Sequence, residues 1–283
     1  MQTFPAPAKL NLFLHVVGRR PDGYHLLQSV MRLIDYGDVL GFEVRHDGQV
    51  YRENPLVGVA PADDLCARAA RLLQSTTACK LGVSIRLDKK LPMGGGLGGG
   101  SSDAATTLLA LNRLWRLDMD QTRLLNLALQ LGADVPFFVF GESAFVEGIG
   151  EVLTPISLEP AWYVVLVPPV EVPTGRIFAS KDLTRNTNPI KMTDFSMART
   201  VNALETVVCR DFPQVDAHLS WLRSFGNGRM SGSGGCVFGT YPSQSQALEV
   251  MAKLPDSMRG FVARGLDQHP LRGFAGEERT SMV

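Results

Sequence analysis

Six of the seven residues from position 94 to position 100 are glycine, and Leu97 is the single interruption. Glycine loses more conformational freedom on folding than any other residue, so such a run is unfavourable unless something must approach the backbone very closely. Residues 82–91 alternate like a strand, and residues 101–115 carry apolar side chains at helical spacing, namely Ala104, Leu108, Leu111 and Trp115. The sequence therefore predicts a tight loop between a strand and a helix.

A glycine loop placed between a strand and a helix is suited to binding phosphate. Peptide N–H groups without a neighbouring Cβ can crowd around an anion, and the first turn of the helix adds unpaired N–H groups and a partial positive charge. A flexible linker or a tight packing turn is the alternative interpretation. A linker would not be bounded by a strand and a strongly amphipathic helix, so the pattern favours a phosphate site.

Two common phosphate loops do not fit this run. It lacks the lysine of GxxxxGK[ST], which excludes a Walker A loop. Gly94, Gly96 and Gly99 match GxGxxG, but a dinucleotide-binding fold needs an acidic residue at the end of the next strand, about 20 residues later. Here Asp118 and Asp120 follow one helix and open another. The loop therefore indicates a different class of nucleotide site.

The charge balance narrows the possible partners. Lys plus Arg and Asp plus Glu both number 28, so the formal net charge is zero, which argues against a nucleic-acid binder. The longest apolar stretch, residues 161–170, is about half of what a membrane span needs. The four cysteines form no CxxC pair and suit a reducing compartment. We therefore expect a soluble cytoplasmic protein whose partners include no nucleic acid and no membrane.

The N-terminal half mixes strand and helix patterns. A turn sequence at 21–23 ends a β-rich segment. The dipeptide Asp47-Gly48 predicts a hairpin between two strand pieces. An amphipathic helix is expected to begin at Asp63 or Asp64, because either side chain can cap its first turn.

A second series of strand and helix patterns begins near residue 155. A buried strand precedes two helices, the first near 196–210, and a strand, a helix and a further strand follow. This order predicts an α+β protein of two domains, residues 1–155 and 156–283. The segment from residue 271 onward is expected to be irregular.

Three motifs in sequence order resemble those of the GHMP kinases: "PAKLNLFL" at 7–14, "PMGGGLGGGSSDAA" at 92–105 and "GRMSGSGGCVF" at 228–238. The resemblance implies a two-domain GHMP kinase architecture. Its N-terminal domain would be ribosomal-S5-domain-2-like and bind ATP, and its C-terminal domain would be a ferredoxin-like α/β sandwich. The resemblance also implies ATP as co-substrate, Mg²⁺, and a monomer or weak homodimer.

Further segments, "PDGYH", "LGADVPFF" and "EGIGEVLTPI", resemble one branch of these kinases. That branch phosphorylates a tertiary hydroxyl of a small molecule carrying a cytidine diphosphate group, on the way to isoprenoid precursors. Two alternatives stay open: a kinase for another small alcohol, such as mevalonate or homoserine, and a non-catalytic nucleotide-binding sensor. The presence of Lys9 and Asp134 argues against the sensor.

The resemblance implies that Lys9 and Asp134 are the catalytic residues. Lys9 is a lone cation in an apolar strand, and a surface strand would instead place it in solvent. Asp134 follows Gly132 and precedes Pro136, which is also good N-cap geometry for a helix. Capping and catalysis compete for the same carboxylate oxygens, so the motif match decides in favour of catalysis.

The resemblance also implies where the substrate binds. Tyr24, His25 and Phe178 would clamp the cytosine, by aromatic stacking and edge hydrogen bonds. Asn11 and Thr174 would lie near the reacting end. Ordinary core packing is the alternative for Tyr24 and Phe178.

The implied ATP site is longer than the glycine run. It comprises Leu65, Lys89, Pro92, Met93, Gly94, Gly95, Gly96, Leu97, Gly98, Gly99, Gly100, Ser101 and Ser102. Ser101 or Ser102 would be the residue to meet Mg²⁺, which usually keeps several waters beside ATP phosphates. Asp103 stands where the family more often has Asn, and its side chain is expected to point away from the nucleotide because carboxylate and phosphate repel each other.

Overall fold

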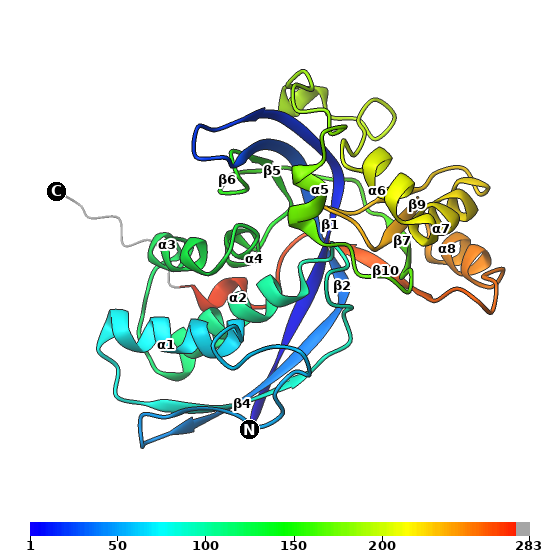
Figure 1. Ribbon diagram of the computed structural model, residues 1–283. Coiled ribbons are helices and arrows are strands. Elements are labelled where there is room, and N and C mark those ends of the chain that lie inside the picture. The colour runs from blue at the N-terminus through cyan, green and yellow to red at the C-terminus, as the bar shows by residue number, and fades with distance from the viewer. Residues whose placement is uncertain (276–283) are drawn as a thin grey trace.

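The computed structural model describes residues 1–275. Two long antiparallel strands, β1 (Gln2–Arg19) and β2 (His25–Arg45), run through its centre (Figure 1). The predicted turn at 21–23 joins them, and the Tyr24 N–H donates to Asp22 Oδ1 over 3.2 Å. This turn brings the end of β1 and the start of β2 to one rim of the molecule.

Within residues 1–275 the strands form one ten-stranded sheet, in the order β3-β4-β2-β10-β7-β9-β8, with β1 and β5 also on β2 and β6 on β5. The shorter strands are β3 (Val50–Arg52), β4 (Gly82–Asp88), β5 (Ala144–Glu147), β6 (Val152–Pro155), β7 (Trp162–Leu166), β8 (Arg229–Met230), β9 (Val237–Tyr241) and β10 (Gly260–Leu266). β10 pairs with both β2 and β7, so it joins the strands of the two halves. The architecture is α+β, as predicted. The boundary between residues 155 and 156 stays a prediction.

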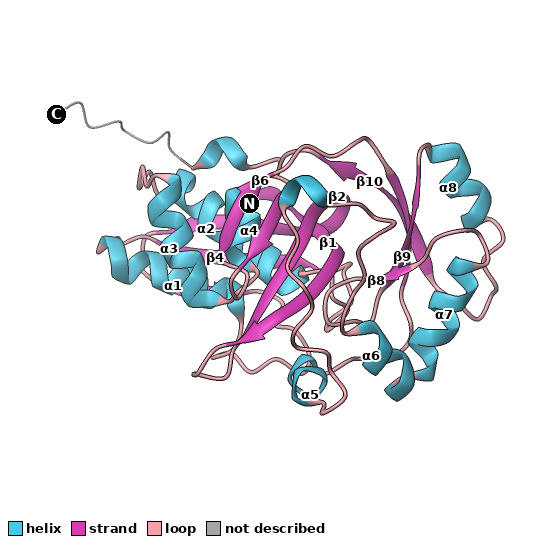
Figure 2. Ribbon diagram, turned by 90° about the horizontal axis from the view of Figure 1, so that it is seen from above, coloured by secondary structure: helices cyan, strands magenta, loops and turns pink. Residues whose placement is uncertain are grey.

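Most helices lie in two groups toward opposite ends of this sheet, and the short helix α5 lies between the groups (Figure 2). They are α1 (Leu65–Thr77), α2 (Gly99–Leu114), α3 (Gln121–Leu131), α4 (Val135–Phe140), α5 (Thr174–Ala179), α6 (Glu205–Asp211), α7 (Pro213–Arg223) and α8 (Gln244–Met251), with short 3₁₀ helices at Met192–Asp194 and Arg272–Phe274. Asp64 caps α1 by accepting the Ala67 N–H at 2.9 Å, as predicted. No helix within residues 1–275 is long and apolar enough to cross a membrane.

Each group of helices buries its own core. Helices α1 and α2 pack on the N-terminal strands, with α3 and α4 packed against α2, whereas α7 and α8 pack on the C-terminal strands, with α6 packed against α7. The predicted apolar face of α2 is buried in the first core, and most other side chains of α2 are buried as well. This surrounding packing fixes α2, and with it the glycine loop that precedes it.

Two expectations for the N- and C-terminal segments are wrong. Asp47-Gly48 does not make a hairpin, because β4 pairs with β2 over residues 39–45, and β3 runs parallel to β4 on the other edge of β4. The segment after residue 271 is not wholly irregular: Leu271 is buried and a 3₁₀ helix follows it. Residues 276–283 lie outside the described part of the chain.

The helix expected near 196–210 begins only at Glu205. The residues before it instead pair with strand β1 through their backbone. The Leu14 N–H donates to the Val201 carbonyl over 3.1 Å, and the Ala203 N–H donates to the Leu14 carbonyl over 2.7 Å. Long-range pairing therefore overrides the helical spacing of these residues.

Candidate active site

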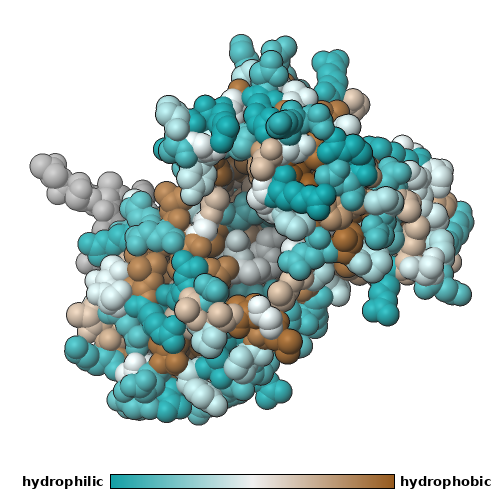
Figure 3. All heavy atoms as spheres, viewed as in Figure 1, coloured by the Kyte–Doolittle hydropathy of each residue, from teal (hydrophilic) through white to brown (hydrophobic). Residues whose placement is uncertain are grey.

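Two adjoining cavities open between the halves of the molecule, where Figure 3 shows its surface hollowed. The larger has a volume of about 760 Å³ and the smaller about 360 Å³. Both are lined by the same five residues at their junction: Gly96, Ser101, Asp134, Thr174 and Ser233. A ligand in one cavity therefore meets a ligand in the other at these side chains.

The glycine loop, residues 94–100, lines the smaller cavity. Four successive carbonyls, those of residues 95–98, are held by donors outside the cavity: Cys236 N, Ser231 Oγ, Lys9 N and Ser102 N, over 2.8–3.0 Å. In a trans peptide the C=O and the following N–H point in opposite directions. The N–H groups of residues 96–99 therefore face away from these anchors, which is the orientation that an anion needs.

The start of α2 adds to this anion site. Its N-cap, Gly98, has φ +71°, and no side chain caps the helix. The first-turn N–H groups and the positive end of the helix dipole are thus free for a ligand. Leu65 and Met93 line the same cavity, so all the implied ATP residues except Ser102 surround it.

Ser102 does not belong to this site. Its side chain is fully buried, and its hydroxyl donates to the Pro7 carbonyl over 2.7 Å. Ser102 instead fastens α2 to β1, because it sits on the helix face turned toward that strand. Of the two serines expected near a metal, only Ser101 lines the cavities.

A second glycine-rich loop, residues 231–235, locks against the first. A Cβ built on Gly96 would lie 2.2 Å from the Ser231 carbonyl oxygen, and one on Gly95 would lie 2.9 Å from Cys236 Sγ. Only residues without side chains allow this approach. Gly232 and Ser233 of this loop reach the larger cavity, and Thr174 Oγ1 lies 2.6 Å from Ser233 Oγ.

Lys9 lies under the junction of the two cavities. Its side chain is 3% exposed, so the interpretation that placed it in solvent is wrong. Lys9 Nζ donates to Asn11 Oδ1 and lies 3.3 Å from Asp134 Oδ2. Asn11 is oriented in turn by donating its Nδ2 to Ser29 Oγ over 2.8 Å. Strand alternation puts Lys9 and Asn11 on the same face of β1.

Asp134 occupies the N-cap position of α4 without capping it. No side-chain hydrogen bond to the helix forms. An N-cap side chain accepts from the second or third helical N–H, and Pro136 in the second position has none. The carboxylate, 36% exposed, therefore keeps oxygens available to Lys9 and to a ligand in either cavity.

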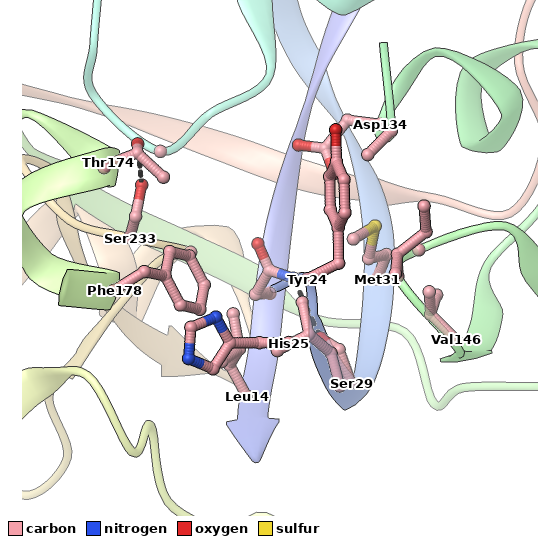
Figure 4. A pocket seen from close by; sticks show the side chains of 18 of the residues that line it. Leu14, Tyr24, His25, Ser29, Met31, Asp134, Val146, Thr174, Phe178 and Ser233 are labelled. Atoms are coloured by element: carbon pink, nitrogen blue, oxygen red, sulfur yellow. Dashed lines mark hydrogen bonds between the residues drawn. The ribbon is translucent and has the colours of Figure 1, made fainter. Parts of the chain in front are cut away.

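The far end of the larger cavity is aromatic. The His25 ring lies against Phe178, with centroids 4.9 Å apart, and Tyr24 lines the same cavity with its ring drawn apart from that pair, toward Asp134 (Figure 4). Tyr24 is 60% exposed, which rules out core packing for it. Burial lowers the pKa of His25 below its ordinary value, and Arg185 and Arg19 lower it further. The ring is therefore neutral at physiological pH.

Comparisons with known proteins agree with this geometry. The model of the GHMP kinases N terminal domain matches residues 64–142, and that of the GHMP kinases C terminal matches residues 192–260. A 4-diphosphocytidyl-2-C-methyl-D-erythritol kinase of Thiobacillus denitrificans is 61% identical over 276 residues, covering 98% of this chain and 99% of that protein. The chain belongs to the 4-diphosphocytidyl-2-C-methyl-D-erythritol kinase family of GHMP kinases.

Two further relatives support this assignment of the kinase. The protein of the same name from Aromatoleum aromaticum is 60% identical over 272 residues, with 96% of each chain covered. A crystal structure of 4-(cytidine 5'-diphospho)-2C-methyl-D-erythritol kinase superposes with a TM-score of 0.82 at 34% identity, covering 93% of this chain and 99% of that one.

In this kinase Lys89 is not a free cation for phosphate. Its Nζ lies 2.6 Å from Asp38 Oδ2 and 2.8 Å from Asp103 Oδ2. Burial lowers the pKa of Lys89, but the two carboxylates more than offset this and leave it above its ordinary value. The Asp103 carboxyl contacts Lys89, but Asp103 also lines the smaller cavity, so its orientation away from the nucleotide stays a prediction. Asp38, which the sequence did not single out, completes the cluster.

We expect Asp103→Asn to stabilise the kinase most at high pH. Burial raises the pKa of Asp103 above its ordinary 3.8, Lys89 opposes this, and Asp38 adds to it. Between 3.8 and the raised value, the folded chain binds more protons than the unfolded chain, so Asp103 makes stability fall as pH rises. An amide does not titrate. The Tm advantage of the variant should grow from pH 4 to pH 8, by about 2–4 °C for each kcal/mol gained.

The matched control is Asp256→Asn, which removes an exposed carboxylate. Its Tm should follow that of the unsubstituted kinase across the same pH range. A Tm deficit of Asp103→Asn that is the same at pH 4 and pH 8 would contradict the raised pKa.

Proposed function

We propose that the chain transfers the γ-phosphoryl group of ATP to the 2-hydroxyl of 4-diphosphocytidyl-2-C-methyl-D-erythritol, giving the 2-phosphate and ADP. This step belongs to the methylerythritol phosphate route to isoprenoid precursors. One observation carries the proposal: the Lys9–Asp134 pair, 3.3 Å apart, lies where a glycine-loop cavity meets a second cavity with an aromatic end. This arrangement can present an alcohol to a terminal phosphoryl group.

The chemistry that the pair performs follows from what phosphoryl transfer requires. The reaction needs alignment, charge neutralisation and an acceptor for the hydroxyl proton. Asp134 accepts the proton of the attacking hydroxyl, because its oxygens are not used by α4. Lys9, held by Asn11, pairs with that carboxylate and offsets negative charge on the transferring group.

The smaller cavity would hold ATP. The N–H groups of residues 96–99 and the start of α2 surround the phosphates, and the apolar side chains of Leu56, Val59 and Leu65 offer a surface for adenine. Within residues 1–275 no group of three or more His, Cys, Asp or Glu side chains is arranged to bind a metal. Mg²⁺ would therefore be held chiefly by phosphate oxygens and water. Of Ser101 and Ser102, only Ser101 lines the cavity in which the ion would lie.

The larger cavity would hold the cytidyl alcohol. The base lies at the aromatic end with Tyr24, His25 and Phe178, and the hydroxyl end reaches Asp134 at the junction. Thr174 and Ser233 line both cavities and so lie beside the reacting groups. The substrate thus spans the cavity from base to reacting hydroxyl.

We further propose that the kinase is a monomer or weak homodimer. We also propose that the kinase is cytoplasmic, because its substrates, ATP and a polar nucleotide alcohol, are metabolites of that compartment. Sedimentation at micromolar concentration tests the oligomeric state.

Substrate-dependent release of ADP tests the function itself. We expect release with ATP, Mg²⁺ and the cytidyl alcohol, and none above background with mevalonate or homoserine. Release with one of those alcohols would favour another GHMP kinase activity. Binding of ATP without release with any of the three alcohols would favour a sensor.

Phe178→Ala is expected to raise the KM for the cytidyl alcohol while leaving the KM for ATP largely unchanged. Stacking of a base on an aromatic side chain is worth about 1–3 kcal/mol, which corresponds to an increase in KM of roughly five- to 150-fold. The matched control is Phe225→Ala, which removes a partly buried ring packed against Trp221 and leaves both cavities intact. Equal increases in both KM values would count against a base clamp at Phe178.

A further inference from the structure

Arg185 sits behind the aromatic end of the larger cavity and does not line it. It follows α5, and its guanidinium is fixed on several sides. Nη2 donates to the carbonyls of Phe178 and Ser180 over 2.9 and 2.6 Å, and Nη1 donates to that of Leu183 over 3.1 Å. The Nε–H group donates to His25 Nε2 over 3.1 Å. An arginine anchored in this way presents one N–H group in a set direction.

The direction of this hydrogen bond determines the tautomer of His25. A guanidinium stays protonated and can only donate. His25 Nε2 must therefore accept, so it carries no hydrogen, and the single ring hydrogen of the neutral imidazole resides on Nδ1. The charged groups facing the ring are Arg185 and Arg19, and both oppose its protonation. His25 thus has a single donor, on Nδ1.

We propose that Arg185 is a positioning residue that holds His25 as the Nδ1–H donor and thereby gives the cavity a preference for cytosine over uracil. The inference deepens the proposed function, since it takes the base to lie at His25 and Phe178. Cytosine has two adjacent acceptors, O2 and N3, whereas N3 of uracil carries a hydrogen. A fixed N–H donor can bond to N3 of cytosine, whereas it faces the N3–H group of uracil and is opposed by it.

The tilted contact between the His25 and Phe178 rings makes the position of the imidazole as important as its tautomer. Arg185 holds the carbonyl of Phe178 as well as the His25 ring, and the two rings lie 4.9 Å apart at 32°. One arginine therefore sets both the hydrogen-bonding edge and the neighbouring stacking surface. Removing it frees His25 to exchange tautomers, so that Nδ1 presents an acceptor part of the time.

The test compares CDP and UDP binding by calorimetry, with excess ADP in the nucleotide cavity, for the unsubstituted kinase and Arg185→Met. At pH 8 the preference for CDP should fall about three- to tenfold, the worth of one neutral hydrogen bond. At pH 6 it should recover in the variant, because a protonated imidazole again carries a hydrogen on Nδ1. The unsubstituted kinase should keep its preference at both pH values. With the cytidyl alcohol, KM should rise and kcat should stay near its original value.

Arg185→Lys and Arg176→Gln complete the design. Lysine keeps a donor for Nε2 and should retain most of the CDP preference. Arg176 lies on α5, the helix that precedes Arg185, and it pairs with Asp211 and lies over the Phe212 ring, so its replacement should leave the preference unchanged. The ¹⁵N shifts of His25 should show a protonated Nδ1 in the unsubstituted kinase and mixed tautomers in Arg185→Met.

Two results would overturn the proposal. The first is weaker binding of both nucleotides by the same factor in Arg185→Met, which a purely structural role predicts. The second is a lost preference that does not return at pH 6. Failure of the proposed function would appear separately, as the absence of ADP release with the cytidyl alcohol in the unsubstituted protein. The ratio of CDP to UDP binding and the ¹⁵N shifts of His25 would still report on the role of Arg185.

Discussion

Asp134→Asn is expected to lower kcat by about 10²–10⁴-fold, the range found when a positioned general base is lost. The amide keeps the size of the side chain but cannot take the hydroxyl proton. It also leaves Lys9, which is 3% exposed, without its carboxylate partner. Binding of ATP and of the cytidyl alcohol should change little by comparison. The N–H groups of residues 96–99 and the aromatic end of the larger cavity do not include Asp134. The expected signature is a large fall in kcat with KM values near those of the unsubstituted kinase.

Single-turnover measurements with saturating ATP and cytidyl alcohol separate this effect from slow product release. Asp120→Asn is the matched control, because Asp120 caps α3 and asparagine caps a helix as well as aspartate does. Turnover of Asp134→Asn at the normal rate would refute proton transfer to Asp134. A fall in the control as large as that in Asp134→Asn would show that the loss reflects general damage.

Gly96→Ala is expected to lower kcat/KM for ATP by about 10²-fold or more. Gly96 has φ +73°, and its Cβ would lie 2.2 Å from the Ser231 carbonyl oxygen. The two glycine-rich loops would have to separate, and the Gly96 carbonyl would lose its bond from Ser231 Oγ. A displacement of about 1 Å in a reacting group can by itself reduce the rate about 10²-fold. Separation of the two loops would displace the N–H groups that surround the phosphates, and it would also displace Gly96, which lies where the two cavities meet.

This variant needs a check on folding, because the left-handed conformation costs a non-glycine residue about 1–2 kcal/mol. Denaturant unfolding gives that loss directly. Gly273→Ala is the control, since a Cβ at Gly273 meets nothing within 4 Å and its φ is not in the left-handed range. An unchanged KM for ATP in Gly96→Ala would show that the loop does not hold the phosphates.

The glycine loop was predictable because its signals are local. The run of glycines, the strand before it and the amphipathic helix after it lie in one stretch of about thirty residues and agree with one another. The paired roles of Lys9 and Asp134 came from the family resemblance, since residues 125 positions apart carry no local sign of contact. Their 3.3 Å separation in the structure supports the pairing.

The features that escaped prediction depend on distant segments. Asp38 on β2 reaches Lys89, which directly follows the paired strand β4, and Arg185 reaches His25 from a loop 160 residues away. Both are charged residues of ordinary appearance in the sequence. The failed hairpin at Asp47-Gly48 has the same origin, because the dipeptide favours a turn but does not specify which strand edge is vacant. The contribution of Ser231 and Ser233 to the site could have been predicted, because both belong to the glycine-rich motif at residues 228–238.

The pairing of β10 with both β2 and β7 has a consequence for how the protein is made. Gly265 and Leu266 pair with β2, while residues 260–264 pair with β7, so the link between the halves is synthesised after both of them. Chains emerging from the ribosome can fold each half in turn. The contacts of residues 201–203 with β1 and of residues 231–236 with the glycine loop become available earlier in synthesis, so the insertion of this late strand completes a sheet whose two halves are already in contact.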